Sequence, residues 1–420
     1  MRGAGLAWLL GLSWHAAVAN DVSQYFRSLP PTIAQCVATG PLRTNELSVC
    51  IYVTPDGAII QSDDFKERSG SGKQMIMDLM LREVLRAVDA MRGAHKGWLS
   101  FAMVYGADGP RSRRPYPVLG FGKIHPAVQP GLLIPNPFFV NPRWWETFTD
   151  GLYVHAQTRP WHTKSAKGLF RGACGPGAKA RFELLSVRDT EHLDVGFTKA
   201  DGYDTVQDCV FALAKEHRFK RADAVYLLNN KVLPQVPQNN YSHYRYLIHM
   251  PGSATGSYSR NLQYLWSHGS IVLIYRHEAI EYYYQWLREG DTHLAVDGRD
   301  IVEKIRWVEA NTTLRKTLLK GARTFQRKYL SHAALVDRWW AILGPLRERQ
   351  DMTPPVPPPT ACTCDATLLA QNSYPECTKC EIVRMKDSRL AKFVGVVPKP
   401  SNSRGASPVD VAATARAAVS

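Results

Sequence analysis

The most informative segment of the sequence runs from Tyr244 to Leu287 and reads YRYLIHM PGSATGSYSR NLQYLWSHGS IVLIYR HEAIEYYYQWL. It begins with a mainly apolar and aromatic run that has the length and composition of a buried strand. A loop of small residues, Pro251 to Ser259, precedes apolar positions at helical spacing from Leu262 to Trp266 and then Gly269, a typical helix C-cap. Ile271 to Ile274 is a second buried apolar run. The stretch therefore predicts a strand, loop, helix and strand unit.

The loop of this unit favours an anion. Small residues leave its backbone N–H groups unobstructed, and the start of the following helix adds partial positive charge. Arg260 lies at that start, where a guanidinium could hold two phosphate oxygens at once. An ordinary turn with a solvated arginine is the alternative, because a single loop of this kind is a weak signal.

The same stretch, with Glu281 after its second strand and the segment from Lys320 to Leu330, resembles the lipopolysaccharide-modifying glycosyltransferase family 90. The resemblance extends from about Asp108 to Trp340. That family includes protein O-glucosyltransferases of the endoplasmic reticulum and fungal capsule xylosyltransferases. It implies an α/β fold of the GT-B type, in which two Rossmann-like domains face a cleft, and inverting transfer without a metal.

Composition and charge are compatible with such an enzyme. The 420 residues are 45% hydrophobic and 21% charged, which is ordinary globular composition and enough for two domains. The formal net charge of +15 would suit nucleic acid, an anionic surface or an anionic substrate. Because lysine and arginine are spread along the chain, nucleic acid is the least favoured of these, and a nucleotide sugar needs only a local basic site.

The N-terminus predicts export. Arg2 precedes a short apolar stretch, and Ala17 to Ala19 fits a cleavage site before Asn20. The apolar stretch is shorter than the roughly 20 residues that span a bilayer, so no membrane span is expected after cleavage; an uncleaved anchor is the alternative. Glycosylation acceptor patterns begin at Asn240 and Asn311. We expect the protein in the lumen of the endoplasmic reticulum or Golgi, or secreted.

Eight cysteines in an exported chain favour disulfides over metal. Cys36 and Cys50 are expected to tie the N-terminal segment together. The pairs between Cys362 and Cys380 have spacings that would suggest zinc in a cytosolic protein; after a signal peptide they predict a small disulfide-tied appendage. A stiff proline-rich linker, Pro354 to Pro359, separates it from the body.

The predicted elements and domains follow from these patterns. We expect a hairpin around Pro55 to Gly57, an amphipathic helix from Lys73 to Met91, a strand from Trp98 to Tyr105, one short strand in 115–142, and helices from Asp300 to Leu346. The predicted ranges are a signal peptide (1–19), a disulfide-stapled segment (20–72), an acceptor-side Rossmann-like domain (73–167), a UDP-sugar-binding Rossmann-like domain with C-terminal helices (168–346), a linker (347–361), the cysteine-containing appendage (362–384) and a disordered tail (385–420).

Asp108 is the candidate catalytic base. It follows the strand predicted to end at Tyr105, and the carboxyl end of a strand is where α/β domains bind ligands. On the residues alone, Asp-Gly-Pro more often only shapes a turn. In the family, an aspartate after this strand, usually within Asp-x-Pro, deprotonates the acceptor hydroxyl, and Asp108-Gly109-Pro110 matches it.

The resemblance also assigns donor-binding residues. Arg171 and Arg181 match two arginines at the donor phosphates, although Ala173 stands where a hydroxyl residue is usual. The segment from Asp194 to Thr198 resembles a uracil-contacting segment, and Glu281, expected on a helix, resembles a ribose ligand. The implied donor site comprises Arg171, Gly172, Arg181, Phe197, Gly252, Ser257, Ser259, Arg260 and Glu281. Trp144, Trp145 and Trp161 could stack on sugars, but core packing is favoured for them.

The chain lacks the HExxH, GxSxG and Asp-x-Asp patterns, the last of which holds a metal on the sugar diphosphate in GT-A enzymes. Arginines and helix N-termini would then neutralise the leaving diphosphate. With the resemblance, this implies a metal-independent inverting O-glycosyltransferase that uses UDP-glucose or UDP-xylose as co-substrate, has no other cofactor, and acts on a protein or polysaccharide acceptor. The alternative is a non-catalytic nucleotide- or carbohydrate-binding protein on a degraded enzyme scaffold.

The predicted signal peptide has a direct consequence for the exported protein. Because its apolar region is short and its cleavage site well placed, we expect the mature chain to begin near Asn20 with oxidised cysteines. N-terminal sequencing and thiol titration of exported protein test this. Protein that keeps Met1 and eight free thiols would contradict it.

Overall fold

The structure is a computed structural model of the chain. It describes residues 22–36, 48–53, 59–61, 81, 84–93, 97–104, 114–125, 129–136, 139, 142–252 and 261–350. The chain divides into two compact units, Met1–Glu381 and Ile382–Ser420, and every described residue lies in the first. The predicted signal peptide, appendage and tail lie outside the described residues, as does the predicted linker (347–361) beyond residue 350; its first residues, 347–349, instead form the end of a helix.

The segment from Tyr244 to Leu287 contributes the middle strands of a parallel sheet. Its strands are β8 (Tyr244–His249) and β9 (Ile271–Tyr275), which pair in parallel. Between them lie α8 (Leu262–Leu265) and a 3-10 turn, η5 (Trp266–His268), and Gly269 ends this turn in the left-handed region with a φ of 57°. The predicted strand, helix, C-cap and second strand are confirmed. Residues 253–260 of the loop lie outside the described residues.

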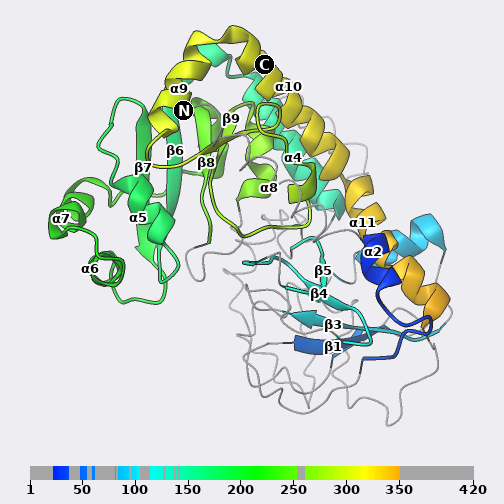
Figure 1. The fold of residues 1–420 in the computed structure, drawn as a ribbon. Helices are drawn as coiled ribbons and strands as arrows, with labels where there is room; N and C mark the ends of the chain where they lie inside the picture. The colour runs from blue at the N-terminus through cyan, green and yellow to red at the C-terminus, as the bar shows by residue number, and fades with distance from the viewer. Residues whose placement is uncertain are drawn as a thin grey trace, which may run out of the picture. The chain divides into compact units, whose positions relative to one another are not determined.

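The complete sheet has five strands in the order β10-β9-β8-β6-β7, all paired in parallel (Figure 1). The remaining strands are β6 (Ser165–Cys174), β7 (Leu193–Ala200) and β10 (Leu294–Val296). From β6 the chain first adds β7 on one side and later β8 on the other. The boundary between β6 and β8 is therefore the topological switch point, where open α/β sheets bind ligands at the carboxyl ends of their strands.

Helices cover both faces of this sheet, because its strands are apolar on both sides. One face packs against α5 (Lys179–Leu185), α6 (Val206–Glu216), α7 (Arg221–Asn230) and α9 (Ile301–Ala310). The other face packs against α4 (Pro142–Gln157), α8, η5 and α10 (Thr312–Tyr329). Figure 1 shows α5 to α7 and α4 with α10 on opposite sides of the strands. Alternation along β6 sends Phe170 into the first core and Leu169 into the second.

A second five-stranded sheet has the order β2-β1-β3-β4-β5. Its strands are β1 (Ser48–Val53), β2 (Ile59–Gln61), β3 (Leu99–Val104), β4 (Val118–Gly120) and β5 (Leu132–Leu133). β1 pairs antiparallel with β2 and β3, and β3, β4 and β5 pair in parallel. The predicted hairpin and the strand predicted from Trp98 to Tyr105 are confirmed. The described residues of the segment 115–142 contain two short strands rather than the predicted one.

Three helical segments pack on this second sheet: α2 (Val22–Arg27), residues 84–92 and α11 (His332–Arg349). Residues 73–80 of the helix predicted from Lys73 lie outside the described residues. The predicted domain boundaries assigned α11 to the other sheet. Its apolar face instead enters the core around β3, where Trp339 and Leu343 belong to the same buried cluster as Phe101 and Met103. The domain ranges stay predictions, but most of the apolar face of α11 packs on the N-terminal sheet, whereas its first turn, at Leu335, packs in the core beside α4.

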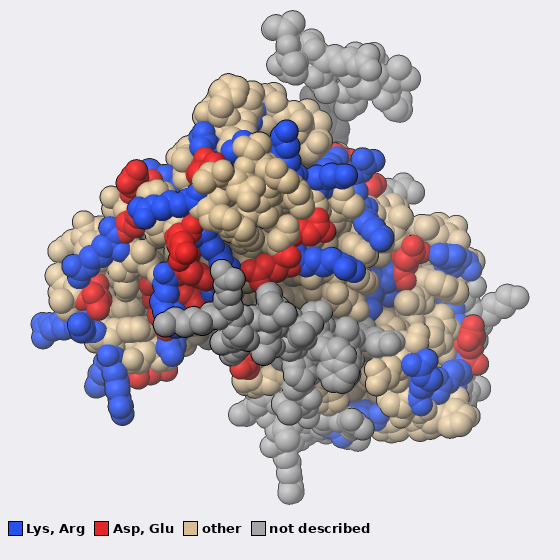
Figure 2. Space-filling model, turned by 45° about the horizontal axis from the view of Figure 1, so that its top comes forward, with Lys and Arg blue, Asp and Glu red and all other residues tan. Residues whose placement is uncertain are grey.

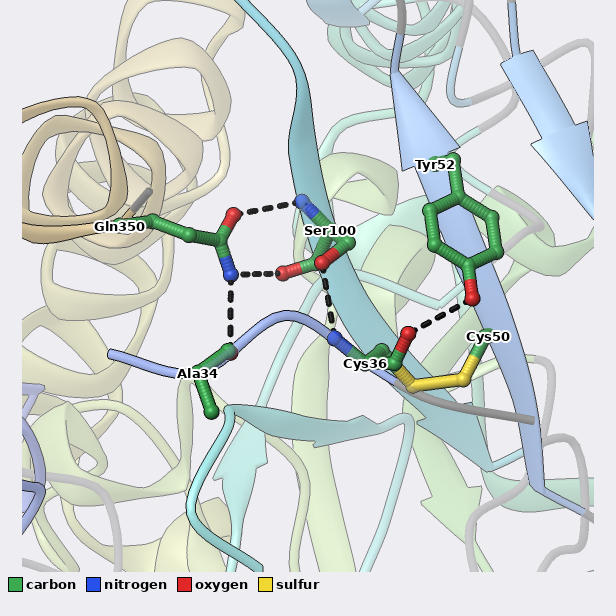
Figure 3. Close-up of a disulfide and its surroundings, with 6 residues drawn as sticks. All are labelled: Ala34, Cys36, Cys50, Tyr52, Ser100 and Gln350. Atoms are coloured by element: carbon green, nitrogen blue, oxygen red, sulfur yellow. Dashed lines mark hydrogen bonds between the residues drawn. A yellow bond between two sulfur atoms is a disulfide. The ribbon is translucent and has the colours of Figure 1, made fainter. Parts of the chain in front are cut away.

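Polar contacts of Gln350 fix the end of α11 to that sheet (Figure 3). Its side chain accepts from the backbone N–H of Ser100 at 2.7 Å and donates to the carbonyls of Ser100 and Ala34 at 2.9 and 3.1 Å. The Ser100 hydroxyl accepts from the N–H of Cys36 at 2.9 Å, and the Tyr52 hydroxyl donates to the Cys36 carbonyl at 2.6 Å. Segments at both ends of the described chain are thus held on one strand, β3.

Two disulfides are formed within the described residues. Cys36–Cys50 confirms the predicted tie of the N-terminal segment, and Cys174–Cys209 joins the end of β6 to α6. The four cysteines after residue 361 lie outside the described residues. Among the helices in the described part of the chain, none is long and apolar enough to cross a membrane.

Close packing of α10 against a neighbouring turn generates a stability prediction. A Cβ on Gly321 would overlap the carbonyl oxygen and Oδ1 of Asp291 and lie 2.7 Å from its carbonyl carbon. We expect Gly321→Ala to lower the free energy of unfolding by about 1 to 3 kcal/mol, measured by chemical denaturation, because backbone must move to admit the methyl group.

Gly151 in α4 provides the matched control. A Cβ there meets nothing within 4 Å, so Gly151→Ala should raise the free energy of unfolding by about 1 kcal/mol through helix propensity alone. If both substitutions changed stability in the same direction and by the same amount, close packing at Asp291 would not be the cause.

Candidate functional site

The candidate site lies at the carboxyl ends of β6 and β8, at the switch point of the parallel sheet. Arg181 of α5 reaches this point and is only 5% exposed. Its Nε and Nη2 donate to the carbonyl oxygen of Pro251 at 3.0 and 2.6 Å, and its Nη1 donates to the carbonyl oxygen of Ala173 at 2.7 Å. One guanidinium therefore joins the end of β6 to the loop that follows β8.

The charge of Arg181 is not compensated by a direct ion pair. Within the described part of the chain no carboxylate lies at ion-pair distance from it, and its donors contact only backbone carbonyls. Burial lowers the pKa of Arg181 to about 10, which the charge of Asp201 partly opposes, so the group stays a cation at neutral pH. A guanidinium has five N–H groups, and three are used, which leaves two without an acceptor among the described residues.

Gly172 makes room for this arrangement. A Cβ at Gly172 would lie 2.5 Å from the ring of Phe170 and 3.1 Å from Nη1 of Arg181. The guanidinium carbon of Arg181 lies 5.5 Å from the Phe170 ring centre, within the range of a cation–π contact. The pairing of β6 with β7 also shifts register between Gly172 and Ala173, which turns the Ala173 carbonyl out of the regular ladder. The predicted donor residues Gly172 and Arg181 thus lie together.

Arg171 lies in a different network. Its guanidinium donates to Oδ1 of Asp194 at 2.6 Å and to the carbonyl oxygens of Asp194, Phe170 and Pro234. Tyr244 donates to the other carboxylate oxygen of Asp194 at 2.6 Å. Burial raises the pKa of Asp194, but these hydrogen bonds outweigh it and lower the pKa below its ordinary value. The structure therefore does not bring Arg171 and Arg181 to a shared partner.

Two further predicted donor residues have contrasting environments. Phe197 is fully buried in the core between β7 and the helices, and its backbone bonds to Lys231 and Leu233. Gly252 lies directly after the carbonyl that Arg181 binds and is half-buried. Phe197 therefore packs in the core of the parallel sheet, whereas Gly252 lies at the carboxyl edge, next to the residue that Arg181 binds.

Glu281 corrects one prediction. It was expected on a helix, but it lies in a non-helical segment between β9 and a 3-10 turn, η6 (Tyr284–Trp286). The reason is the preceding residue: Ile280 pairs with Lys123 through backbone hydrogen bonds of 3.0 and 2.8 Å, and this bridge keeps the backbone extended. The helix prediction at this position was wrong.

The Glu281 carboxyl group is enclosed by polar partners. Asn136 donates to it at 2.6 Å and Tyr283 at 2.8 Å, and Asn136 also bonds Gln263 of α8 at 2.9 Å. Burial raises the pKa of Glu281 to about 8, and the two hydrogen bonds only partly oppose that effect. At neutral pH the carboxyl group is mainly protonated and can donate as well as accept.

Two histidines at the same edge were missed by the sequence reading. His249 is the last residue of β8, with Nδ1 3.2 Å from Oδ1 of Asn261 and Nε2 3.2 Å from the hydroxyl of Tyr284. His277 follows β9, and its ring centre lies 5.6 Å from that of His249. Both ring nitrogens of His277 are buried, and neither makes a hydrogen bond of regular geometry with the described residues, although the backbone of Ala279 lies close enough to raise its pKa. The available signal was a histidine at the carboxyl end of each of two adjacent buried strands.

Burial governs the charge of both imidazoles. It lowers the pKa of His249 well below its ordinary value, with His277 and Arg181 adding to the effect. It lowers the pKa of His277 to about 4, opposed only by the backbone of Ala279. Both rings are therefore neutral at pH 7. They contribute hydrogen-bonding groups rather than positive charge.

Several predicted residues are not placed. Asp108, Ser257, Ser259 and Arg260 lie outside the described residues. Trp145 is buried, and its Nε1 donates to the carbonyl of Leu330 at 2.7 Å, which confirms core packing for that tryptophan. Trp161 is half-buried between Arg245 and Arg315, each 5.4 Å from its ring centre.

The described surface carries charges of both signs (Figure 2), and its acidic and histidine side chains do not gather into a metal site. Figure 2 shows basic and acidic side chains interspersed over the described part of the face it displays. Within the residues that the structure describes, no group of three or more histidine, cysteine, aspartate or glutamate side chains could hold a metal ion.

About half of the chain is similar in sequence to known protein O-glucosyltransferases. Rat (Rattus norvegicus) protein O-glucosyltransferase 1 is 25% identical over 230 residues, which cover 54% of this chain and 52% of the relative. Human (Homo sapiens) protein O-glucosyltransferase 3 is 23% identical over 210 residues, covering 49% and 37%. The chain thus spans about half the length, or less, of these curated relatives. Anabaena HepE in complex with UDP and glucose is 13% identical and has a TM-score of 0.33, covering 46% of this chain and 54% of that one.

A family model provides the decisive match. The model of glycosyl transferase family 90 matches residues 136–405, which is more than half of the chain. The matched region includes β6 to β10, the Arg181 site and Glu281. The family predicted from the sequence is confirmed, and this chain belongs to glycosyl transferase family 90.

Proposed function

We propose that this chain transfers glucose, or xylose, from its UDP-sugar to a hydroxyl group of a protein or glycan, with inversion and without a metal. The family and the names of the relatives support sugar transfer. Glucose is the favoured sugar, because the relatives are protein O-glucosyltransferases. The disulfides Cys36–Cys50 and Cys174–Cys209 support an oxidising compartment, so we assign the enzyme to the secretory pathway.

The observation that carries the proposal is the buried cation at the switch point. Arg181 has no ion-pair partner within the described residues and retains two N–H groups beyond those that bind Pro251 and Ala173. A buried charge of this kind is costly unless another group compensates it. The diphosphate of a nucleotide sugar supplies that compensation, and in the transition state it gains charge as it leaves. Arg181 would do electrostatically what a metal does in other glycosyltransferases.

The proposal includes a GT-B arrangement. Two separate sheets, each with its own apolar core, support it. In this arrangement the UDP-sugar binds at the carboxyl edge of the sheet from β6 to β10, and the acceptor binds on the side of the sheet from β1 to β5. Arg260, Ser257 and Ser259 remain proposed donor ligands in the loop after β8. The donor role of Arg171 stays a prediction, since its guanidinium is engaged by Asp194 here.

Arg181 generates the test of the donor site. We expect Arg181→Met to weaken UDP binding about 10- to 100-fold by calorimetry, because a charged hydrogen bond is worth roughly 1.5 to 3 kcal/mol. Methionine preserves much of the side-chain volume. Added manganese or EDTA should leave transfer by the wild-type enzyme unchanged.

Arg338 is the matched control for Arg181. It is also a buried arginine that donates to a backbone carbonyl, that of Leu133, but it lies in α11. Arg338→Met should lower the melting temperature without changing UDP affinity. Equal UDP affinity in Arg181→Met and wild type would refute the donor role of Arg181.

Asp108 generates the test of catalysis. An inverting transfer needs the acceptor hydroxyl deprotonated on the face opposite the leaving UDP, so the base must come from the acceptor side. Loss of a general base typically costs about 100- to 10,000-fold, and we expect Asp108→Asn to lose transfer by that factor while UDP affinity stays unchanged. Near-normal transfer by this variant would show that another residue is the catalytic base. UDP binding by the wild type without hydrolysis or transfer of any UDP-sugar would instead support the non-catalytic alternative.

A further inference from the structure

His277 is the group at the candidate site that the proposed mechanism does not use. It follows β9 by two residues, so it lies at the same carboxyl edge as Arg181, next to His249. Its two ring nitrogens are buried and make no hydrogen bond of regular geometry with the described residues. Buried polar groups in native proteins are nearly always paired, and an unpaired one needs an explanation.

The neighbours of His277 are already satisfied. The pairing of His249 with Asn261 and Tyr284 suits one tautomer, in which Nδ1–H donates to the amide oxygen and Nε2 accepts from the hydroxyl. Tyr284 therefore has its proton engaged, and its ring centre lies 6.1 Å from that of His277. Among the described residues only the backbone of Ala279 acts on the His277 ring, and no hydrogen bond of regular geometry uses its donor or its acceptor.

The exposure of His277 also distinguishes it from its neighbours. His249 has no exposed surface, whereas His277 is half-buried as a residue although its nitrogens are covered. The ring is neutral at pH 7 for the reason given above, so it suits a neutral donor and acceptor such as a hydroxyl group.

We infer that His277 is a specificity-determining residue of the donor site, whose imidazole exchanges hydrogen bonds with a hydroxyl group of the UDP-sugar. This inference rests on the proposed function. Arg181 would hold the diphosphate at β6 and β8, and the adjacent strand β9 would place His277 beside a sugar ring attached to it. Both the ribose and the transferred sugar carry such hydroxyl groups, and the experiment below distinguishes them.

His268 offers a matched control within the same sheet. Its two ring nitrogens are also buried without a partner among the described residues, and burial lowers its pKa to about 3. It differs in position, because it precedes β9 at the amino edge, where its ring lies near Tyr241 and Tyr264. It has no exposed surface. A substitution there removes the same kind of group from the amino edge, opposite to the carboxyl edge where open α/β sheets bind ligands.

The test measures UDP and UDP-glucose affinity of the full chain by calorimetry, with the melting temperature of each variant. We expect His277→Phe, which keeps a ring of similar size, to weaken UDP-glucose binding about 3- to 15-fold, the usual worth of a neutral hydrogen bond. The melting temperature should stay the same or rise. His277→Asn, which keeps a donor and an acceptor, should recover part of the affinity, and His268→Phe should not change it.

The pattern of losses identifies the hydroxyl group and separates the two proposals. A loss shared by UDP and UDP-glucose assigns the contact to the ribose, and a loss confined to UDP-glucose assigns it to the transferred sugar. Wild-type affinity for both ligands in His277→Phe, together with weak UDP binding by Arg181→Met, would overturn the inference and keep the proposed function. Absence of UDP and UDP-glucose binding by the wild type would overturn both.

Discussion

The architecture of the site depends on one buried guanidinium. Arg181 binds the carbonyl oxygens of Ala173 and Pro251, which lie at the ends of two neighbouring parallel strands. Parallel strands diverge into separate loops at their carboxyl ends, and no backbone ladder continues to hold those loops together. A side chain that accepts no hydrogen bond but donates several is suited to joining two carbonyls there. The start of the loop after β8 is therefore positioned by α5, an element that belongs to the preceding strand.

Burial of this cation constrains the residues around it. Gly172 has no side chain because the Phe170 ring and the guanidinium fill that space. The disulfide Cys174–Cys209 ties the next part of the chain to α6, and α5 and α6 pack into the same core. These constraints act within a short segment of sequence. They explain why an Arg-Gly pair followed by a second arginine forms a recognisable pattern although the two arginines have different partners in the structure.

Sequence patterns predicted the elements of the fold well where local physics decides them. The apolar runs at β8 and β9, the glycine at 269 and the hairpin of β1 and β2 require only burial, a left-handed C-cap and turn chemistry. Glu281 was placed on the wrong kind of element, because a bridge between Ile280 and Lys123 connects residues far apart in the chain. The sequence could not predict the partners of Arg171 or the surroundings of His277, since both depend on residues from other parts of the chain. Asp108 and Arg260 lie outside the described residues, so their predicted roles are neither supported nor opposed by geometry.

Each edge of the parallel sheet has a buried cation, and the hydrogen bonds of these two cations explain why we place the proposed donor site at the carboxyl edge. At the amino edge, the ammonium group of Lys164 donates to the carbonyls of His268 and Gly269 at 2.9 and 2.6 Å and to the hydroxyl of Ser270 at 3.2 Å. An ammonium group has three N–H donors, so Lys164 is saturated by the protein, and its charge stabilises the carbonyl end of η5. At the carboxyl edge, Arg181 has N–H groups to spare within the described residues. Both cations are buried and both have pKa values lowered by burial, to about 8 for Lys164 and about 10 for Arg181. What separates the structural cation Lys164 from the proposed binding cation Arg181 is therefore the number of donors left unused, not burial or charge.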